Sequence, residues 1–274
     1  MRRNNRYAEF TALVGYALLI LPAVALGILA MMRAGVPVAL WGQQAAAWVV
    51  LALLACLLRR AARRISADTW GVLLLLFLAV SLLGEETGGA RRWVNLGVFN
   101  VNAAMLVLPA LIVMLSKTGY PCPLLIGAAA VVAVQPDLSQ LLALSAAGIP
   151  ALLRRGRRLQ AFGCVLFLAV LGVRCISMPV TAEPVPYCEG ILDLLGGVSA
   201  ELRLAGWAAL ALVPAALMMW YFVGRNMQAL SLALYYAVLL LFVPVGEYPV
   251  PFMGFGLSPI AGYYLAYVCG GVRG

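Results

Sequence analysis

Residues 10–32 read FTALVGYALLILPAVALGILAMM and contain no charged side chain. A run of roughly 20 apolar residues is long enough to cross the hydrocarbon core of a bilayer as a helix. The basic segment MRRNNRY before it has the charge of a signal peptide. The apolar run is too long for a signal h-region and lacks a clear cleavage site, so we interpret it as the first transmembrane helix.

The rest of the chain repeats this pattern, with short polar segments between apolar ones. The sequence predicts ten spans, near residues 10–32, 39–58, 69–84, 101–116, 122–134, 138–153, 159–177, 199–222, 228–245 and 257–271. The shorter spans are compatible with half-spans held by neighbouring helices. We find no long linker and no internal repeat. We therefore expect residues 1–274 to form a single domain, an all-α polytopic transmembrane helical bundle without a soluble domain.

Composition supports this class of protein and excludes others. The chain is 65% hydrophobic and 11% charged, whereas soluble domains carry about 25% charged residues. The net charge of +9 comes from basic residues in short bursts, and a nucleic-acid binder would gather them on one polar face, so we expect no nucleic-acid partner. There is no histidine, and the six cysteines form no CxxC pair. We therefore predict no metal site and no cofactor.

The positions of the basic residues predict the orientation. With the N-terminus inside, the inner segments hold Arg2, Arg3, Arg6, Arg59, Arg60, Arg63, Arg64, Lys117, Arg154, Arg155, Arg157, Arg158, Arg225 and Arg273. Basic residues stay on the cytoplasmic side of a membrane, so both termini are expected there. The arginine clusters near residues 60 and 154 fall on one side only if an even number of spans separates them.

Two arginines on the outer side need an explanation. Arg91 and Arg92 follow Glu85 and Glu86 in the segment between the third and fourth spans. Guanidinium groups bind phosphate in a bidentate manner, so one interpretation is a site for an anionic ligand. The other is a local salt bridge to Glu85 or Glu86, and the sequence leaves both open.

Two further outer segments concentrate polar residues. Gln135 and Asp137 flank a proline between two short apolar runs, and an ionisable group at membrane depth is a functional candidate by default. Asp137 also suits the N-cap of the following helix. After the seventh span come Glu189 and Asp193. An outer carboxylate can act as a general base or bind a divalent cation, or it can be an ordinary solvated acid.

These segments, in this order, resemble the SEDS family (shape, elongation, division and sporulation), the family of RodA and FtsW. The matching residues are Glu86, Gly89-Ala90-Arg91-Arg92-Trp93, Leu96-Gly97, Phe99, Gln135-Pro136-Asp137-Leu138, Glu201-Leu202, Gly206, Pro249, Pro251-Phe252 and Gly256. The resemblance covers nearly the whole chain. It implies a peptidoglycan glycosyltransferase, multi-pass in the bacterial cytoplasmic (inner) membrane.

The resemblance also implies a substrate, a partner and roles for residues. The substrate would be lipid II or another undecaprenyl-pyrophosphate-linked sugar, and the partner a class B penicillin-binding protein. An outer-loop carboxylate would be the base: Leu192 falls at the family's catalytic position, so Asp193 is the candidate, with Glu189 in reserve. The residues implied to bind substrate are Arg91, Arg92, Glu86, Gln135, Asp137 and Glu201.

Several departures from the family pattern favour an alternative function. The large outer loop after the seventh span shrinks here to about fifteen residues. The fourth span has Met105 and Leu108 where the family has a Glu–Lys pair. The alternative is a catalytically inactive SEDS-like scaffold that binds a lipid pyrophosphate or a partner membrane protein. Transport of a lipid carrier is a weaker third hypothesis, because the spans lack a charged interior.

Two cysteines bracket the shortened outer loop. Cys175 and Cys188 both fall on the outer side, which is an oxidising compartment in bacteria. A bond between them would close a loop of about fourteen residues and contribute roughly 3 kcal/mol. We therefore predict a Cys175–Cys188 disulfide, against the alternative of two thiols that pack as small hydrophobes.

Overall fold

The structure, a computed structural model, describes residues 2–84, 86, 89, 91–95, 97, 100–178, 184–246 and 248–270, with residues 2–9 described by their backbone alone. The helices are α1 (Arg2–Arg33), α2 (Val38–Ala62), α3 (Ala67–Val80), α4 (Ala103–Leu115), α5 (Pro121–Val134), α6 (Leu138–Arg154), α7 (Arg158–Ile176), α8 (Ile191–Val198), α9 (Ala200–Gly224), α10 (Met227–Phe242) and α11 (Leu257–Gly270). Two short 3-10 helices, η1 (Ser81–Leu83) and η2 (Val243–Val245), follow α3 and α10. The strands β1 (Trp93–Asn95) and β2 (Asn100–Asn102) pair antiparallel, with Trp93 opposite Asn102.

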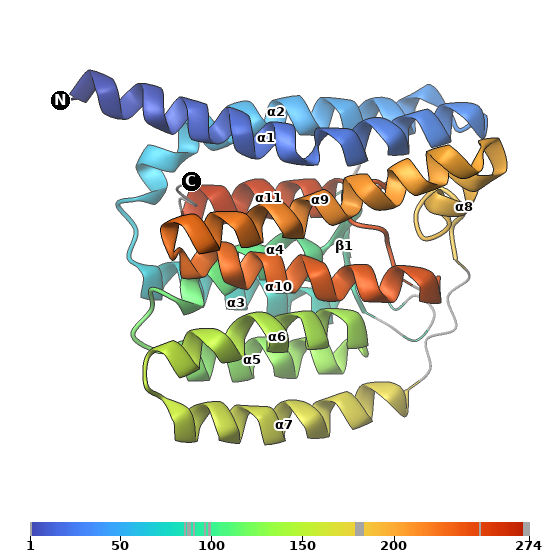
Figure 1. The fold of residues 1–274 in the computed structure, drawn as a ribbon. Coiled ribbons are helices and arrows are strands. Elements are labelled where there is room, and N and C mark those ends of the chain that lie inside the picture. The colour runs from blue at the N-terminus through green and yellow to red at the C-terminus, as the bar shows by residue number, and fades with distance from the viewer. Residues whose placement is uncertain are drawn as a thin grey trace.

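The helices form a transmembrane bundle (Figure 1), in which α1 packs on α2, α6 packs on α5 and α7, and α9 packs on α10. Five described helices are long and apolar enough to cross a membrane: α1 from Phe10, α2, α7, α9, and α10 together with η2. The others are shorter: α8 has eight residues, and the rest range from 13 residues in α4 to 17 in α6. Each of the ten predicted spans corresponds to one helix, and the predicted all-α membrane fold is confirmed.

Because the helices alternate in direction, their connections gather at two ends of the bundle. We call the end that holds the described residues of the segments 84–102, 135–137, 177–199 and 243–256 the cap end. Figure 1 shows the N- and C-termini together at the opposite end, which we call the termini end. The shared location of the termini agrees with an even number of spans. That this end faces the cytoplasm stays a prediction.

The arginine clusters of residues 59–64 and 154–158 both lie at the termini end, as the even number of spans between them requires. Some of these arginines also close connections there. Arg155 donates hydrogen bonds to the backbone carbonyls of Thr118 and Ser116, the latter at 2.7 Å. Basic side chains at this end therefore carry the topology signal and satisfy backbone groups that follow α4.

Polar residues begin several helices by capping them. A side-chain oxygen just before the helix accepts a hydrogen bond from a backbone N–H that has no partner inside the helix. Such N-caps are Ser66 of α3, Asn102 of α4, Asp137 of α6, Ser199 of α9 and Asn226 of α10. Short polar connections are thus sufficient to separate one apolar helix from the next.

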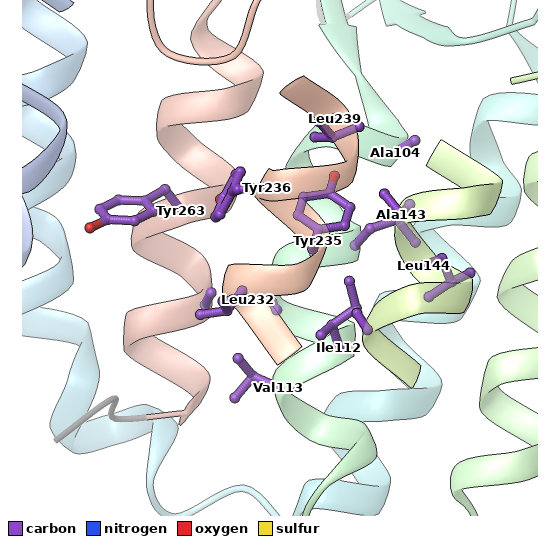
Figure 2. Packing of buried hydrophobic residues seen from close by; sticks show 14 of the residues in the cluster. Ala104, Ile112, Val113, Ala143, Leu144, Leu232, Tyr235, Tyr236, Leu239 and Tyr263 are labelled. Atoms are coloured by element: carbon purple, nitrogen blue, oxygen red, sulfur yellow. The ribbon is translucent and has the colours of Figure 1, made fainter. Parts of the chain in front are cut away.

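Helix α4 lies at the centre of the bundle. All its residues except Leu106 are buried, against α3, α6, α10 and α11. Figure 2 shows Ile112 of α4 near Tyr235 of α10 and Leu144 of α6. A helix that is hydrophobic all round can face lipid or lie inside a bundle, and α4 lies inside the bundle. The apolar fourth span is therefore the core, around which the cap-end segments are arranged.

Helix α7 lies at the periphery of the bundle and, unlike α4, is largely exposed. Its buried residues are Ala161, Cys164, Leu168, Gly172 and Cys175. Their spacing of three or four positions defines one face, which packs on α5 and α6. The other faces of α7 are apolar and exposed, as expected for a helix in contact with lipid.

The first and last helices are joined by a reciprocal pair of tyrosines. The hydroxyl of Tyr16 in α1 donates to the backbone carbonyl of Tyr263 in α11 at 3.2 Å, and the hydroxyl of Tyr263 donates to the carbonyl of Tyr16 at 2.9 Å. Their rings stack with centroids 3.8 Å apart. Both side chains are fully buried, so this pairing satisfies two hydroxyls inside an apolar core.

A helix and a strand pair were not predicted from the sequence. Helix α8 lies within the expected outer loop. The strand β1 lies between the third and fourth predicted spans, and its partner β2 replaces the start of the predicted span 101–116. Eight residues are too few for helical periodicity to be evident, and the pair Gly196-Gly197 in α8 is typical of a loop. The outer loop is therefore short but partly helical.

Candidate functional site

A buried ion pair joins two of the three polar segments that the sequence singled out. Arg92, directly before β1, lies with its Nε 3.5 Å from Oδ2 of Asp137, and their side chains are 10% and 4% exposed. A buried charge costs several kcal/mol unless it is paired. The two segments must therefore come together for either charge to be buried.

Two arginines cap the carboxyl end of α5. Arg92 donates to the backbone carbonyls of Gln135 at 3.4 Å and Pro136 at 3.0 Å. Arg174 of α7 donates to the carbonyl of Ala133. The last carbonyls of a helix have no partner inside it and carry partial negative charge. These two arginines therefore bind backbone carbonyls, which gives basic side chains on the predicted outer side a structural role.

Asp137 combines the two roles that the sequence left open. Its Oδ1 accepts hydrogen bonds from Ser139 Oγ at 2.8 Å and from the backbone N–H of Gln140 at 3.1 Å, so it is the N-cap of α6. Its Oδ2 faces Arg92. The same carboxylate thus starts a helix and neutralises a buried guanidinium.

Two buried amides flank this pair. Gln135 donates from Nε2 to Ser81 Oγ in η1, and Gln140 accepts from the hydroxyl of Tyr235 at 2.6 Å. Among the described residues, Gln135 Oε1 and Gln140 Nε2 are buried without a hydrogen-bond partner. Unsatisfied buried polar atoms are uncommon, and an ordered water or a ligand group is the usual partner.

Arg91, the neighbour of Arg92 in sequence, has a different environment. Its Nε lies 3.5 Å from Glu86 Oε2, and the two side chains are 51% and 56% exposed. An exposed pair of this kind contributes at most about 1 kcal/mol, so a stronger anion can displace it. Arg91 is therefore the accessible cation of the two. Glu85, the other predicted partner, lies outside the described residues.

Asp193, the predicted base, lies in the first turn of α8. It forms an ion pair with Arg203 of α9 at 2.9 Å, with side chains 75% and 53% exposed. Glu201, also exposed, follows the N-cap Ser199 in the first turn of α9. No ion pair or hydrogen bond given for the described residues connects Glu201 with the Arg92–Asp137 pair.

Glu189, the predicted reserve base, closes a turn. Its Oε2 accepts a hydrogen bond from the backbone N–H of Val185 at 2.8 Å. The carbonyl of Val185 in turn accepts from the backbone N–H of Glu189 at 3.0 Å. The carboxylate is thus engaged locally, ahead of α8. Glu183, an acid of the same loop, lies outside the described residues.

The segment 184–190 is bound to the segment 248–256. The backbone N–H of Phe255 donates to the carbonyl of Tyr187 at 2.8 Å, and their rings meet edge to face at 5.9 Å. The ring of Tyr248 in turn lies 5.6 Å from the guanidinium carbon of Arg92. Contacts therefore link all the polar segments of the cap end, and we call this linked set the cap cluster.

One residue of the cap cluster was missed in the sequence. Gln44 of α2 is fully buried, and its Nε2 donates to the carbonyls of Phe252 at 2.8 Å and Met253 at 3.2 Å. Phe252 has a φ of 65°, a left-handed conformation that is costly for a bulky residue. Gln44 stabilises this turn. The signal was available as a Gln-Gln pair inside an apolar span.

The predicted Cys175–Cys188 disulfide is wrong, because both thiols are free. Cys188 donates to the carbonyl of Phe255 at 3.3 Å, whereas Cys175 Sγ lies 4.0 Å from the carbonyl of Ala133. Figure 1 shows α7, which carries Cys175, on the opposite side of the bundle from α8. Their separation in sequence suited a disulfide, but packing places the two ends of the loop in different layers.

We expect both cysteines to react as free thiols. In unfolded protein, the number of alkyl groups taken up should be the same with and without reductant, as measured by mass spectrometry. In folded protein Cys188 should react slowly, because burial, and then the nearby Glu189 carboxylate, raise the pKa of its thiol well above the usual value. If the unfolded protein took up two fewer alkyl groups without reductant than with it, the predicted disulfide would be present after all.

No group of three or more potential metal ligands (His, Cys, Asp or Glu) occurs among the described residues. The outer carboxylates that the structure describes are instead separate: Asp137 pairs with Arg92, and Asp193 with Arg203.

Comparisons with known proteins identify the fold. No protein-family model and no curated protein sequence matches this chain. An aspartate-to-alanine mutant of the rod shape determining protein RodA of Thermus thermophilus matches with a TM-score of 0.65 and 19% identity, over 94% of this chain and 97% of that one. RodA without the mutation gives 0.57 and 22%, over 94% and 96%. A structure on the coordination of polymerization and crosslinking by a peptidoglycan synthase complex gives 0.57 and 20%, over 93% and 96%.

Proposed function

We propose that this chain, which has the RodA fold along nearly its whole length, is a SEDS protein of peptidoglycan synthesis in the bacterial cytoplasmic membrane. We propose further that it polymerises lipid II at its cap end. The observation that carries the proposal is the cap cluster. It includes residues that resemble the family motifs, among them Gln135, and it contains the buried pair of Arg92 and Asp137.

Asp193 is the proposed general base. Its carboxylate would take the proton of an attacking sugar hydroxyl while that oxygen bonds to the anomeric carbon of a second lipid-linked sugar. The bond from the anomeric carbon to the pyrophosphate breaks at the same time. Arg203, 2.9 Å away, has to turn aside so that the sugar hydroxyl can reach the carboxylate. Both side chains are exposed, so little free energy opposes this movement.

Arg91 is the proposed contact to the leaving pyrophosphate. Its guanidinium is half exposed, and among the described residues it pairs with Glu86 and donates to the carbonyl of Leu82 at 3.3 Å. A cation fixed near a developing negative charge stabilises the transition state. Arg92 and Asp137 would act behind it as positioning residues. The free buried oxygen of Gln135 suits a substrate hydroxyl, and a role for Glu201 stays a prediction.

The proposed protein partner is a class B penicillin-binding protein. One solved structure with this fold is described as part of a complex that coordinates polymerization and crosslinking. A polymerase that releases its product outside the membrane needs a crosslinking enzyme nearby. Helices α7 and α9 expose large apolar side chains, including Phe162 and Phe222, and so offer surface to a membrane helix.

Polymerisation of purified lipid II by the reconstituted protein, with and without a class B partner, tests the proposal. Asp193→Asn should reduce the rate by about 100-fold or more, the usual effect of losing a general base. Glu189→Gln is the matched control and should retain activity, because Glu189 already binds the Val185 N–H. Full activity of Asp193→Asn would reject this base. If the wild-type protein formed no polymer even with its class B partner, the proposal that it is a polymerase would be rejected.

A second candidate function is a catalytically inactive scaffold. The observation in its favour is the start of α4, where Ala104, Met105 and Leu108 are buried apolar residues at positions that are polar in the family. The ion pair of Asp193 with Arg203 also leaves the proposed base neutralised. The scaffold would bind the class B partner stably while forming no polymer under any condition.

A further inference from the structure

The termini end contains a basic pocket, far from the cap cluster. It has a volume of about 320 Å³ and lies where α2, α3 and α11 meet. Three cations, Arg59, Arg63 and Lys117, line it, and none of its described lining residues is acidic. A pocket with this charge is complementary to an anion.

The cations are held in place by the fold. The guanidinium of Arg59 lies 4.0 Å above the ring of Tyr267 and is 4% exposed. Nζ of Lys117 donates to the carbonyl of Gly270 at 2.6 Å. A pocket of pre-positioned charges loses little side-chain entropy when an anion binds.

An apolar groove of about 340 Å³ continues from the basic pocket. The two share Ala62, Ile65, Trp70 and Val268 as walls. The groove follows α2 from Leu51 to Ala62 and faces the outside of the bundle. It carries no charged side chain among its described lining residues.

The length of the groove corresponds to one leaflet. From Leu51 to Ala62 an α-helix rises about 16 Å, and half of the hydrocarbon core is about 15 Å thick. Trp70, shared by pocket and groove, donates from its indole N–H to the carbonyl of Ala62 at 3.1 Å. Tryptophan is the residue that prefers the boundary between headgroups and hydrocarbon. The basic pocket, the boundary at Trp70 and the apolar groove therefore follow one another in the same order as the headgroup, the interface and the acyl chain of a lipid.

We propose that the basic pocket and the groove together bind one acidic phospholipid of the leaflet at the termini end. Its phosphate would lie among Arg59, Arg63 and Lys117, and an acyl chain would follow α2. Basic pockets between transmembrane helices recognise anionic headgroups in this way. The site lies at the opposite end of the bundle from the cap cluster and does not depend on the proposed function.

The test is a titration of the detergent-solubilised full chain with dioleoyl phosphatidylglycerol, followed by native mass spectrometry. Dioleoyl phosphatidylcholine, with the same chains and no net charge, should bind at least about tenfold more weakly. The double variant Arg63→Gln/Lys117→Gln should lose this preference. Arg60→Gln/Arg64→Gln is the matched control: it removes the same charge from neighbouring positions outside the pocket and should keep the preference.

The groove is tested separately by Ala61→Trp, which fills it without a change in charge and should weaken binding of both lipids. An equal loss of preference in the two double variants would reduce the site to general surface charge and overturn the proposal. Equal binding of the two lipids would also overturn it. If the water-soluble headgroup alone, at equal concentration, displaced phosphatidylglycerol, the pocket would be a site for a soluble anion and the lipid proposal would be overturned. If the protein bound undecaprenyl phosphate tenfold more tightly than phosphatidylglycerol, the proposal of a phospholipid as the occupant would be rejected.

Discussion

Replacing Arg92 with alanine should lower the free energy of unfolding by about 3–5 kcal/mol, because it leaves Asp137 as a buried charge without its partner. The carbonyls of Gln135 and Pro136 would lose a donor as well. Replacing Arg91 with alanine should change stability by less than about 1 kcal/mol, since its ion pair with Glu86 is exposed. Two adjacent arginines are therefore expected to differ strongly.

Denaturation of both variants in the same detergent, followed by circular dichroism, measures this difference. The variant Arg92→Ala should unfold at clearly lower temperature or denaturant concentration than Arg91→Ala, which serves as its matched control. The variant Asp137→Asn should fall between them, because it removes the charge but keeps the shape of the N-cap. Equal stabilities of the two arginine variants would show that the buried pair does not hold the cap cluster together.

Introducing leucine at Gly262 should prevent α4 and α11 from packing and cost at least about 3 kcal/mol. A Cβ atom at this position would lie 2.1 Å from the backbone oxygen of Met105 and 2.9 Å from that of Leu106. Backbone atoms cannot turn aside as a flexible side chain does. Small residues at such contacts allow transmembrane helices to approach closely, and α4 and α11 form the most extensive helix contact of the described bundle.

Gly163 of α7 provides the control, since no atom lies within 4 Å of the Cβ that a substitution would add. The variant Gly163→Leu should give monodisperse protein in size-exclusion chromatography at the wild-type yield. The variant Gly262→Leu should give aggregated protein or none. Similar elution profiles and melting temperatures for the two variants would show that α4 and α11 do not pack as closely at Gly262 as described.

The sequence was sufficient for the membrane fold because the bilayer imposes strong rules. Apolar length predicted the helices, and the arginine clusters near residues 60 and 154 required the even number of spans between them. The N-cap role of Asp137, one of the two interpretations that the sequence left open, is confirmed. These features depend on local sequence and on the solvent, which is a membrane, and so they are visible without tertiary structure.

The arrangement of the candidate site was beyond the sequence. Nothing in the pair Arg91-Arg92 shows which side chain turns inwards, because that depends on where the carboxyl end of α5 lies. The pairing of Asp193 with Arg203 depends on α8, which is too short to be recognised. The disulfide prediction failed for the same reason: Cys175 and Cys188 are near in sequence, and only packing separates them.

The reciprocal bond between Tyr16 and Tyr263 has a consequence for biogenesis. The two residues are 247 positions apart, so at about 5–20 residues per second the ribosome needs roughly 12–50 s to synthesise the second after the first. During that time α1 is held by its neighbour α2, for example through the bond from Trp48 to the carbonyl of Ala17 at 3.0 Å. The insertion machinery therefore has to release the first hairpin into the lipid with a buried tyrosine still lacking its partner. Helix α11, which is synthesised long after α1, supplies the partner that the buried hydroxyl of Tyr16 lacks until then.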